Sequence, residues 1–128
     1  SAIDVFRSSN CPIILMHSVS EYPAPEEALN LRCIVTLRDR YNCRVGYSGH
    51  ESSVSPSIVA AAIGACTIER HITLDRAMYG SDQSASLEPV GLETLVAQIR
   101  KVPVVTGDGV KRVTSAEKKN ADKLRYWL

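Results

Sequence analysis

The sequence predicts an α/β fold in which parallel strands alternate with helices. The expected strands are short runs between turns, and the first of them is apolar, branched and uninterrupted, as in a buried strand of a parallel sheet. Segments with helical spacing of apolar residues come after these runs, so that strand and helix alternate at roughly 20 to 30 residues per unit. The 128 residues, 45% of them hydrophobic and 23% charged, have the composition of one globular unit.

The first predicted strand and helix lie on either side of a proline-rich turn. The apolar run at residues 13–16 is uninterrupted and suits a strand that is buried on both faces. A helix is expected from Pro25, since proline suits the first helical turn and the two glutamates after it complement the helix dipole. Its apolar residues keep helical spacing as far as Val35, and the charged stretch 38–40 ends it.

Two further strands enclose a short apolar helix. The second strand is expected at about residues 44–47 and the third at about residues 66–72. Between them, Ser55-Pro56 provides a cap and a proline for the first turn of a helix over residues 57–63. This helix is expected to stop at Gly64.

The last part of the chain predicts two more helices. Apolar residues at helical spacing mark the first over residues 89–102. Residues 106–109 are expected to form a turn, because their Gly-Asp-Gly lacks the preceding strand and the long following helix of a phosphate loop. Thr114 and Glu117 form a capping box for a polar helix that ends near Trp127.

Charge and hydropathy exclude two classes of partner. The chain has 15 Lys and Arg against 14 Asp and Glu, a net charge of +1 that gives no field for attracting nucleic acid. The longest run without a charged or strongly polar residue, at about residues 58–66, is half of what a membrane span needs. Asp4 and Arg7 interrupt any apolar leader at the start. We therefore expect no nucleic-acid partner, no membrane span and no export signal.

The four cysteines are expected to be reduced. They lie at positions 11, 33, 43 and 66, with no C-x-x-C pair and no histidine at zinc-finger spacing. Their mostly apolar neighbours predict thiols that pack as small hydrophobic side chains. Reduced cysteines indicate a cytoplasmic protein.

All three histidines lie at or just past the end of a predicted strand. Function in parallel β/α folds sits at these carboxyl ends. His50 and His71 could each offer an imidazole nitrogen to one divalent ion, because neighbouring strands lie about 4.8 Å apart. The alternative is that each of these two histidines only hydrogen-bonds a loop carbonyl.

Two other side chains near the strand ends are candidates for function. Glu69 shares the strand parity of His71, and a carboxylate pointing the same way is costly unless it is paired or functional. The alternative for Glu69 is an ion pair with an inward Arg or Lys. Tyr22, held before a proline, either packs over the strand end or contacts a substrate. Of the acidic residues near the loop 79–82, we expect only one to matter.

Four segments in order and spacing resemble one enzyme family. MHSVSEYPAP, VGYSGHE, IERHITLDR and GSDQSASLEP closely resemble the sialic acid synthase family, meaning the N-acetylneuraminate synthases and their legionaminate and pseudaminate relatives. GDGVKR and KLRYW are similar to the stretch that ends the catalytic domain in bacterial members. The resemblance covers about residues 12 to 128, and four motifs in register are far more specific than GYSGH alone.

The resemblance implies a fold and a reaction. Family members are (β/α)8 TIM barrels followed by a small antifreeze-like domain. They condense phosphoenolpyruvate with an N-acetylmannosamine-type sugar, an N-acetylated hexose, and use a divalent metal, often Mn²⁺, with Mg²⁺ or Co²⁺ possible. Because such a barrel takes roughly 250 residues, residues 1–128 are expected to be a single unit of about three β/α units from its C-terminal part. The N-terminal strands and the antifreeze-like domain are expected to be absent.

The resemblance also assigns roles to residues at the strand ends. The implied roles are metal ligation and catalysis for His50 and His71, catalysis for Glu69, and substrate binding for Ser20, Tyr22, Ser48 and Asp82. Ser20 stands where many bacterial members have Asn, Gly49 where Asp is common, and Gln83 where His is frequent. These departures leave the identity of the sugar open.

The sequence therefore predicts a protein that makes a sialic or related nonulosonic acid, with this chain holding part of the active site. The isolated chain is expected to be inactive, because the lysines that bind phosphoenolpyruvate in the family lie on earlier strands. The alternatives are a related synthase acting on another sugar and a non-catalytic fragment that binds metal or sugar or assists assembly. The exposed sheet is expected to be covered by the remainder of the barrel or by a second copy.

Overall fold

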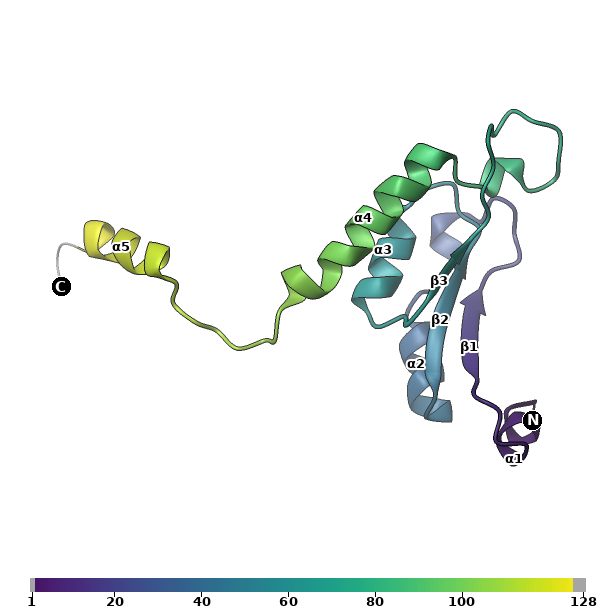
Figure 1. The fold of residues 1–128 in the computed structure, drawn as a ribbon, viewed down its shortest axis with the longest axis horizontal. Helices are drawn as coiled ribbons and strands as arrows, with labels where there is room; N and C mark the ends of the chain where they lie inside the picture. Colours follow the sequence, from purple (N-terminus) through teal and green to yellow (C-terminus); the bar gives the residue numbers. More distant parts are fainter. Residues whose placement is uncertain (1, 126–128) are drawn as a thin grey trace.

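The protein forms a three-stranded parallel sheet with helices on one side (Figure 1). The computed structural model describes residues 2–125. The strands lie in the order β1-β2-β3, with bounds Ile14–Ser18, Arg44–Gly49 and Ile68–Arg70. The helices packed near the sheet are α2 (Cys33–Tyr41), α3 (Ser55–Ala62) and α4 (Pro89–Thr106). The predicted α/β class with parallel strands is confirmed.

The hydrophobic core lies between the sheet and helices α2 and α3. Its buried members are Ile34, Val45, Tyr47 and Ala60. Successive residues of a strand point to opposite faces. Val45 and Tyr47 point to the helices, so Gly46 and Ser48 lie on the face that carries no helix in Figure 1.

The helix-free face is closely filled below the strand ends. A Cβ built on Gly46 would lie 2.4 Å from Cγ2 of Thr67 and 2.6 Å from Sδ of Met16. Only a glycine therefore fits between these two side chains. Met16 and Thr67 close the sheet surface beneath Ser48, two residues along β2 from the site described below.

The strands differ in extent from the prediction. β2 continues two residues further than expected, and β3 is shorter, with Ile72 forming only an isolated bridge to Leu87. Burial of the first strand on both faces is wrong for this chain, because Ile14 and Met16 are 42% and 37% exposed. β1 is an edge strand, and its side chains Ile14 and Met16 lie on the helix-free face.

The helix expected from Pro25 is wrong in its first half. Residues Glu26–Ala28 form only a 3₁₀ turn, and α2 begins at Cys33. Asn30 has φ +39°, a left-handed conformation that interrupts a helix. The preceding Leu29 is buried, and its carbonyl lies 2.7 Å from Nε2 of His17. This tertiary contact holds the chain in a turn that helical spacing alone does not predict.

The remaining helices follow the prediction more closely. Pro56 lies in the first turn of α3, but Ser55 is not its cap, because Val54 takes the N-cap position. Gly64, with φ +104°, follows the end of α3 as expected. α4 runs four residues beyond the predicted end, to Thr106, where the predicted turn follows.

The terminal helices lie at the two ends of the molecule. α1 (Ala2–Ser8) was not predicted and lies below β1 in Figure 1. α5 (Ser115–Leu124) lies apart from the sheet and begins with the predicted capping box of Thr114 and Glu117. Its predicted end near Trp127 lies outside the described residues. Within residues 2–125, no helix is both long and apolar enough to cross a membrane.

The cysteines are free, as predicted, but they are not core residues. Cys11 and Cys66 are exposed, and Cys33 and Cys43 are partly buried. Ile34 beside Cys33 is a core residue, and Ala65 beside Cys66 packs against the core, while the thiols themselves are not core members.

Candidate functional site

Ser48 and Glu69 lie in register at the ends of β2 and β3. They are direct partners in the parallel pairing of the two strands. Ser48 Oγ donates a hydrogen bond to Oε1 of Glu69 at 2.7 Å, from a buried position. The hydroxyl orients the carboxylate, whose own side chain is exposed on the helix-free face. Among the described residues, Glu69 forms no ion pair with an Arg or Lys.

His50 and His71 come together just beyond these strand ends. Their ring centroids lie 5.2 Å apart, edge to face. Nδ1 of His50 lies 2.7 Å from the carbonyl oxygen of Val19. Because a carbonyl can only accept, Nδ1 carries the proton and the lone pair of Nε2 is available to a ligand. His50 thus makes the loop hydrogen bond and keeps a free nitrogen, so the two interpretations of this residue are compatible.

Tyr22 and Asp82 complete the cluster around the histidines. The Tyr22 ring centroid lies 4.3 Å from that of His50 and 5.8 Å from that of His71. Oδ2 of Asp82 lies 3.5 Å from Nδ1 of His71, and both side chains are partly exposed. Tyr22 is 43% exposed, so it packs on the histidines and still offers a surface to a substrate. These four residues come from three separate loops at the strand ends.

Other residues near the strand ends lie outside the cluster. Ser20 is exposed and forms no hydrogen bond with another described residue. His17 points to the helix side, where its ring lies 6.0 Å from that of Tyr47. Asp75 accepts from the backbone of its own loop, and Glu88 accepts from the backbone of Arg76. Of the three acidic residues of this region, Asp82 is the one that lies beside a histidine of the cluster.

A buried ionic network on the helix side of the sheet was not predicted. Nη1 of Arg70 lies 2.9 Å from Oε1 of Glu51, and both side chains are at most 2% exposed. Tyr47 donates its hydroxyl to Oε2 of Glu51 at 2.8 Å, and Ser57 donates to Oε1 at 3.1 Å. Burial and the bond to Glu51 raise the pKa of Tyr47 far above its ordinary value, and burial lowers the pKa of Arg70. The strand parity of Arg70, opposite to that of Glu69, could have indicated this burial.

The histidine pair offers two nitrogen donors of the kind that bind divalent metals. Imidazole nitrogens suit divalent transition ions, and a catalytic ion keeps positions open for substrate or water. Within residues 2–125, no group of three or more His, Cys, Asp or Glu side chains is arranged to hold an ion. Nε2 of His50 and the ring of His71 have the donor chemistry that such an ion needs, and two donors alone do not complete a site.

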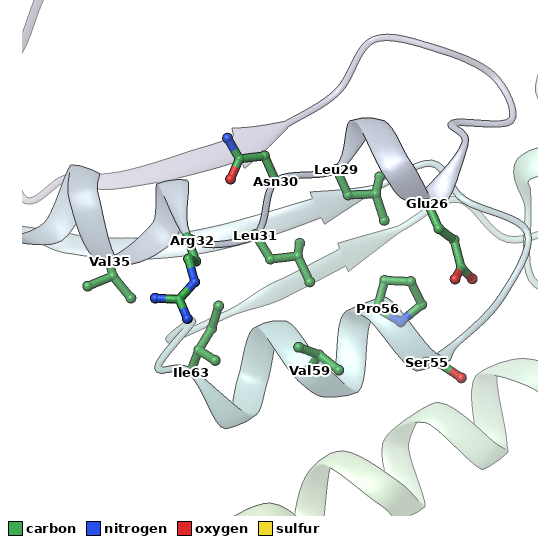
Figure 2. A pocket seen from close by; sticks show the side chains of 10 residues that line it. All are labelled: Glu26, Leu29, Asn30, Leu31, Arg32, Val35, Ser55, Pro56, Val59 and Ile63. Carbon is green, nitrogen blue, oxygen red and sulfur yellow. The ribbon is translucent and has the colours of Figure 1, made fainter.

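A groove lies on the helix side of the sheet, between the segment 26–35 and α3 (Figure 2). It has a volume of about 670 Å³ and is lined mainly by apolar side chains, among them Leu31, Val35, Val59 and Ile63. Figure 2 shows Glu26 and Arg32 at its rim. No predicted site residue lines it, so the groove and the strand-end cluster are separate features.

Comparisons with known proteins identify the family. The family model described as the NeuB family matches residues 1–111. The N,N'-diacetyllegionaminic acid synthase of Campylobacter jejuni is 44% identical over 116 residues, which are 91% of this chain and 35% of that protein. The human N-acetylneuraminate-9-phosphate synthase is 38% identical over 121 residues, which are 94% of this chain and 34% of that protein.

A solved structure shows the same arrangement. The N-acetylneuraminic acid synthetase of Leptospira borgpetersenii, crystallised with citrate, superposes with a TM-score of 0.82 at 34% identity. The match covers 98% of this chain and 45% of that chain. The chain spans about a third of the length of the curated relatives it matches. The predicted resemblance is confirmed: the chain belongs to the NeuB family, the sialic and nonulosonic acid synthases.

Proposed function

We propose that this chain supplies part of the active site of a synthase that condenses phosphoenolpyruvate with an N-acetylated sugar to give a nonulosonic acid. The observation that carries the proposal is the meeting of His50 and His71, with Tyr22 and Asp82 beside them, at the carboxyl ends of parallel strands. In a member of the NeuB family, this is where substrate and metal would be bound.

The two histidines are oriented so that they could bind a divalent ion. Val19 O fixes the tautomer of His50, and Asp82 lies near Nδ1 of His71, so that Nε2 of each ring would be the ligand atom. An ion held there, Mn²⁺ in preference to Mg²⁺ or Co²⁺, would supply Lewis-acid polarisation of the carbonyl oxygen of the open-chain sugar.

The neighbouring side chains bind the substrate and handle protons. Tyr22 and Asp82 would contact the sugar, with Ser20 at the edge of the same loop. Glu69, oriented by Ser48, would accept a proton from a hydroxyl group or water at the reacting centre. In the reaction, the methylene carbon of phosphoenolpyruvate bonds to the aldehyde carbon of the sugar. Water then adds to the former enol carbon, and phosphate leaves.

We further propose that residues 1–128 form a single unit from the C-terminal part of a (β/α)8 barrel. The sheet has two open edges, β1 and β3, and its helix-free face carries the site. Further strands beside these edges would enclose that face and bring the cationic groups that phosphate requires. The remainder of the barrel is the partner that fits this arrangement, and a second copy is the alternative. The free cysteines are consistent with a cytoplasmic enzyme.

The decisive experiment compares histidine variants of the protein that carries this chain. His71→Ala should abolish Mn²⁺-dependent release of phosphate from phosphoenolpyruvate and sugar. His17→Ala is the matched control, since His17 lies on the helix side, and it should retain the activity in its folded fraction. N-acetylmannosamine and a 2,4-diacetamido sugar should be compared as acceptors. If His71→Ala kept its turnover and its metal dependence, the proposal would be wrong.

The isolated 128 residues provide a second measurement. Calorimetry with Mn²⁺ and with each sugar should show binding without turnover, because groups from several strands are needed to position the reactants. Full turnover by this chain alone would contradict its role as part of a site. Binding without turnover even in the complete protein would instead support a non-catalytic module.

A further inference from the structure

We infer that Glu51 and Arg70 are positioning residues, whose ion pair on the helix side of the sheet fixes the spacing of His50 and His71 on the other side. The inference rests on the proposed function for what the histidines bind. It goes beyond that function by assigning a role to a buried network that touches neither substrate nor metal.

The pair joins the two chain segments that carry the histidines. Glu51 directly follows His50, and Arg70 lies between Glu69 and His71. Alternate residues of an extended chain point to opposite faces, so the ion pair lies behind the cluster rather than in it. Because each charged residue is the neighbour of a histidine, a backbone shift that follows loss of the ion pair would also move that histidine.

Arg70 also holds the loop that follows β2. Its Nη1 donates to the carbonyl of Ser53 at 2.9 Å and to Oγ of Ser57 at 3.0 Å. Its Nη2 donates to the backbone carbonyl of Glu51. The guanidinium thus joins the end of β3 to the segment 51–53 by side-chain and backbone contacts together. This segment comes directly after His50, so the connection fixes the end of one strand relative to the other.

Gly49 provides the space in which the carboxylate sits. A Cβ on residue 49 would lie 2.7 Å from Oε2 of Glu51 and 2.8 Å from Cε1 of Tyr47. A methyl group here would push the carboxylate away from its donors without changing any charge. Gly49→Ala is therefore a neutral way to disturb the pair.

Stability alone gives a weak reason for such a pair. Burying two charges costs about as much as their attraction returns, and apolar replacements of similar volume are often neutral. A pair with defined hydrogen-bond directions does, however, restrict the geometry of what it connects. Metal and catalytic sites depend on neighbouring residues that hold their side chains in place, because a displacement of about 1 Å can remove much of the activity.

The test separates positioning from folding. In the protein that carries this chain, the double variant Glu51→Leu with Arg70→Met replaces the pair by apolar side chains, and Gly49→Ala displaces the carboxylate. Asp108→Asn is the control, because it breaks an exposed ion pair with Arg112 far from the site. Three quantities are measured: the urea midpoint, the Kd for Mn²⁺ alone by electron paramagnetic resonance, and the metal-free nuclear Overhauser effect between the two histidine rings.

We expect the double variant and Gly49→Ala to fold, to bind Mn²⁺ about 10- to 100-fold more weakly and to lose the ring-to-ring signal, while Asp108→Asn matches the wild type. The single variant Arg70→Lys should bind Mn²⁺ more tightly than the double variant and more weakly than the wild type. Lysine keeps the positive charge but lacks the planar guanidinium fork. If the double variant does not fold, Gly49→Ala decides. Wild-type Mn²⁺ affinity and ring signal in a folded variant of either kind would overturn the inference.

Failure of the proposed function would look different. If His71→Ala bound Mn²⁺ as tightly as the wild type, the metal assignment would be wrong. The ring-to-ring signal of the double variant would still show whether Glu51 and Arg70 position the two histidines.

Discussion

Glu51 and Arg70 form a buried ion pair, 2.9 Å between Oε1 and Nη1, across the ends of two neighbouring strands. Each is the direct sequence neighbour of a histidine in the cluster on the opposite face. Residues 50–51 and 70–71 therefore each place a charged side chain on the helix side of the sheet and a histidine on the opposite face. Substitutions of the charged residues are expected to change the positions of the histidines.

Removing only one partner of this pair should be strongly destabilising. Arg70→Met leaves the Glu51 carboxylate buried without its counter-charge, which costs about 3–5 kcal/mol of unfolding free energy. Urea titration followed by circular dichroism measures this loss. Arg112→Met, in an exposed ion pair, should leave the curve unchanged. Equal curves for both variants would show that Glu51 relaxes into solvent.

Tyr47 should make stability depend on alkaline pH. Because its pKa is raised in the folded protein, the folded state keeps the phenol proton at pH values where the unfolded state has lost it. The contribution is complete below about pH 10, the ordinary tyrosine value, and declines as the pH rises further. Tyr47→Phe should lack this decline, so the two urea midpoints should converge from pH 9 to pH 11. Parallel pH profiles would refute the assignment.

Loss of the Ser48 hydroxyl should affect turnover more than metal binding. Ser48→Ala removes the donor to Glu69, a bond to a charged group worth about 1.5–3 kcal/mol. We expect kcat of the protein that carries this chain to fall about 10- to 100-fold, with the Kd for Mn²⁺ unchanged. Ser18→Ala is the matched control, because Ser18 pairs with Ser48 in the sheet but does not bond to Glu69. A loss of Mn²⁺ affinity in Ser48→Ala would mean that Glu69 contributes to the metal site.

The capping box should control the order of α5. Oγ1 of Thr114 accepts from the backbone N–H of Glu117 at 3.1 Å, and the Glu117 side chain accepts from the N–H of Thr114 at 2.8 Å. Thr114→Ala should reduce amide exchange protection in α5 about fivefold, with no change in the sheet. Hydrogen exchange with mass spectrometry distinguishes the two regions. Thr114→Ser, which keeps the hydroxyl, should behave like the wild type.

Local patterns predicted the elements whose signals lie within a few residues. The run before His17 is short, apolar and branched, and it forms a strand with close to the expected bounds, as does the segment before His50. Thr114 and Glu117 satisfy each other across three residues, so their capping box is visible in sequence alone. The helix from Pro25 fails because a distant group, the His17 ring, hydrogen-bonds Leu29 just before the left-handed Asn30.

Periodicity and motif order are sufficient to predict the alternation of strand and helix, the family, and the position of the histidines at strand ends. Which residues meet depends on tertiary packing. Parity separates Arg70 from Glu69, but only the packing of α3 against the sheet brings Ser57 and Glu51 to the guanidinium. Likewise, the 5.2 Å spacing of the His50 and His71 rings follows from the register of β2 and β3, and register depends on contacts between residues that lie far apart in the chain.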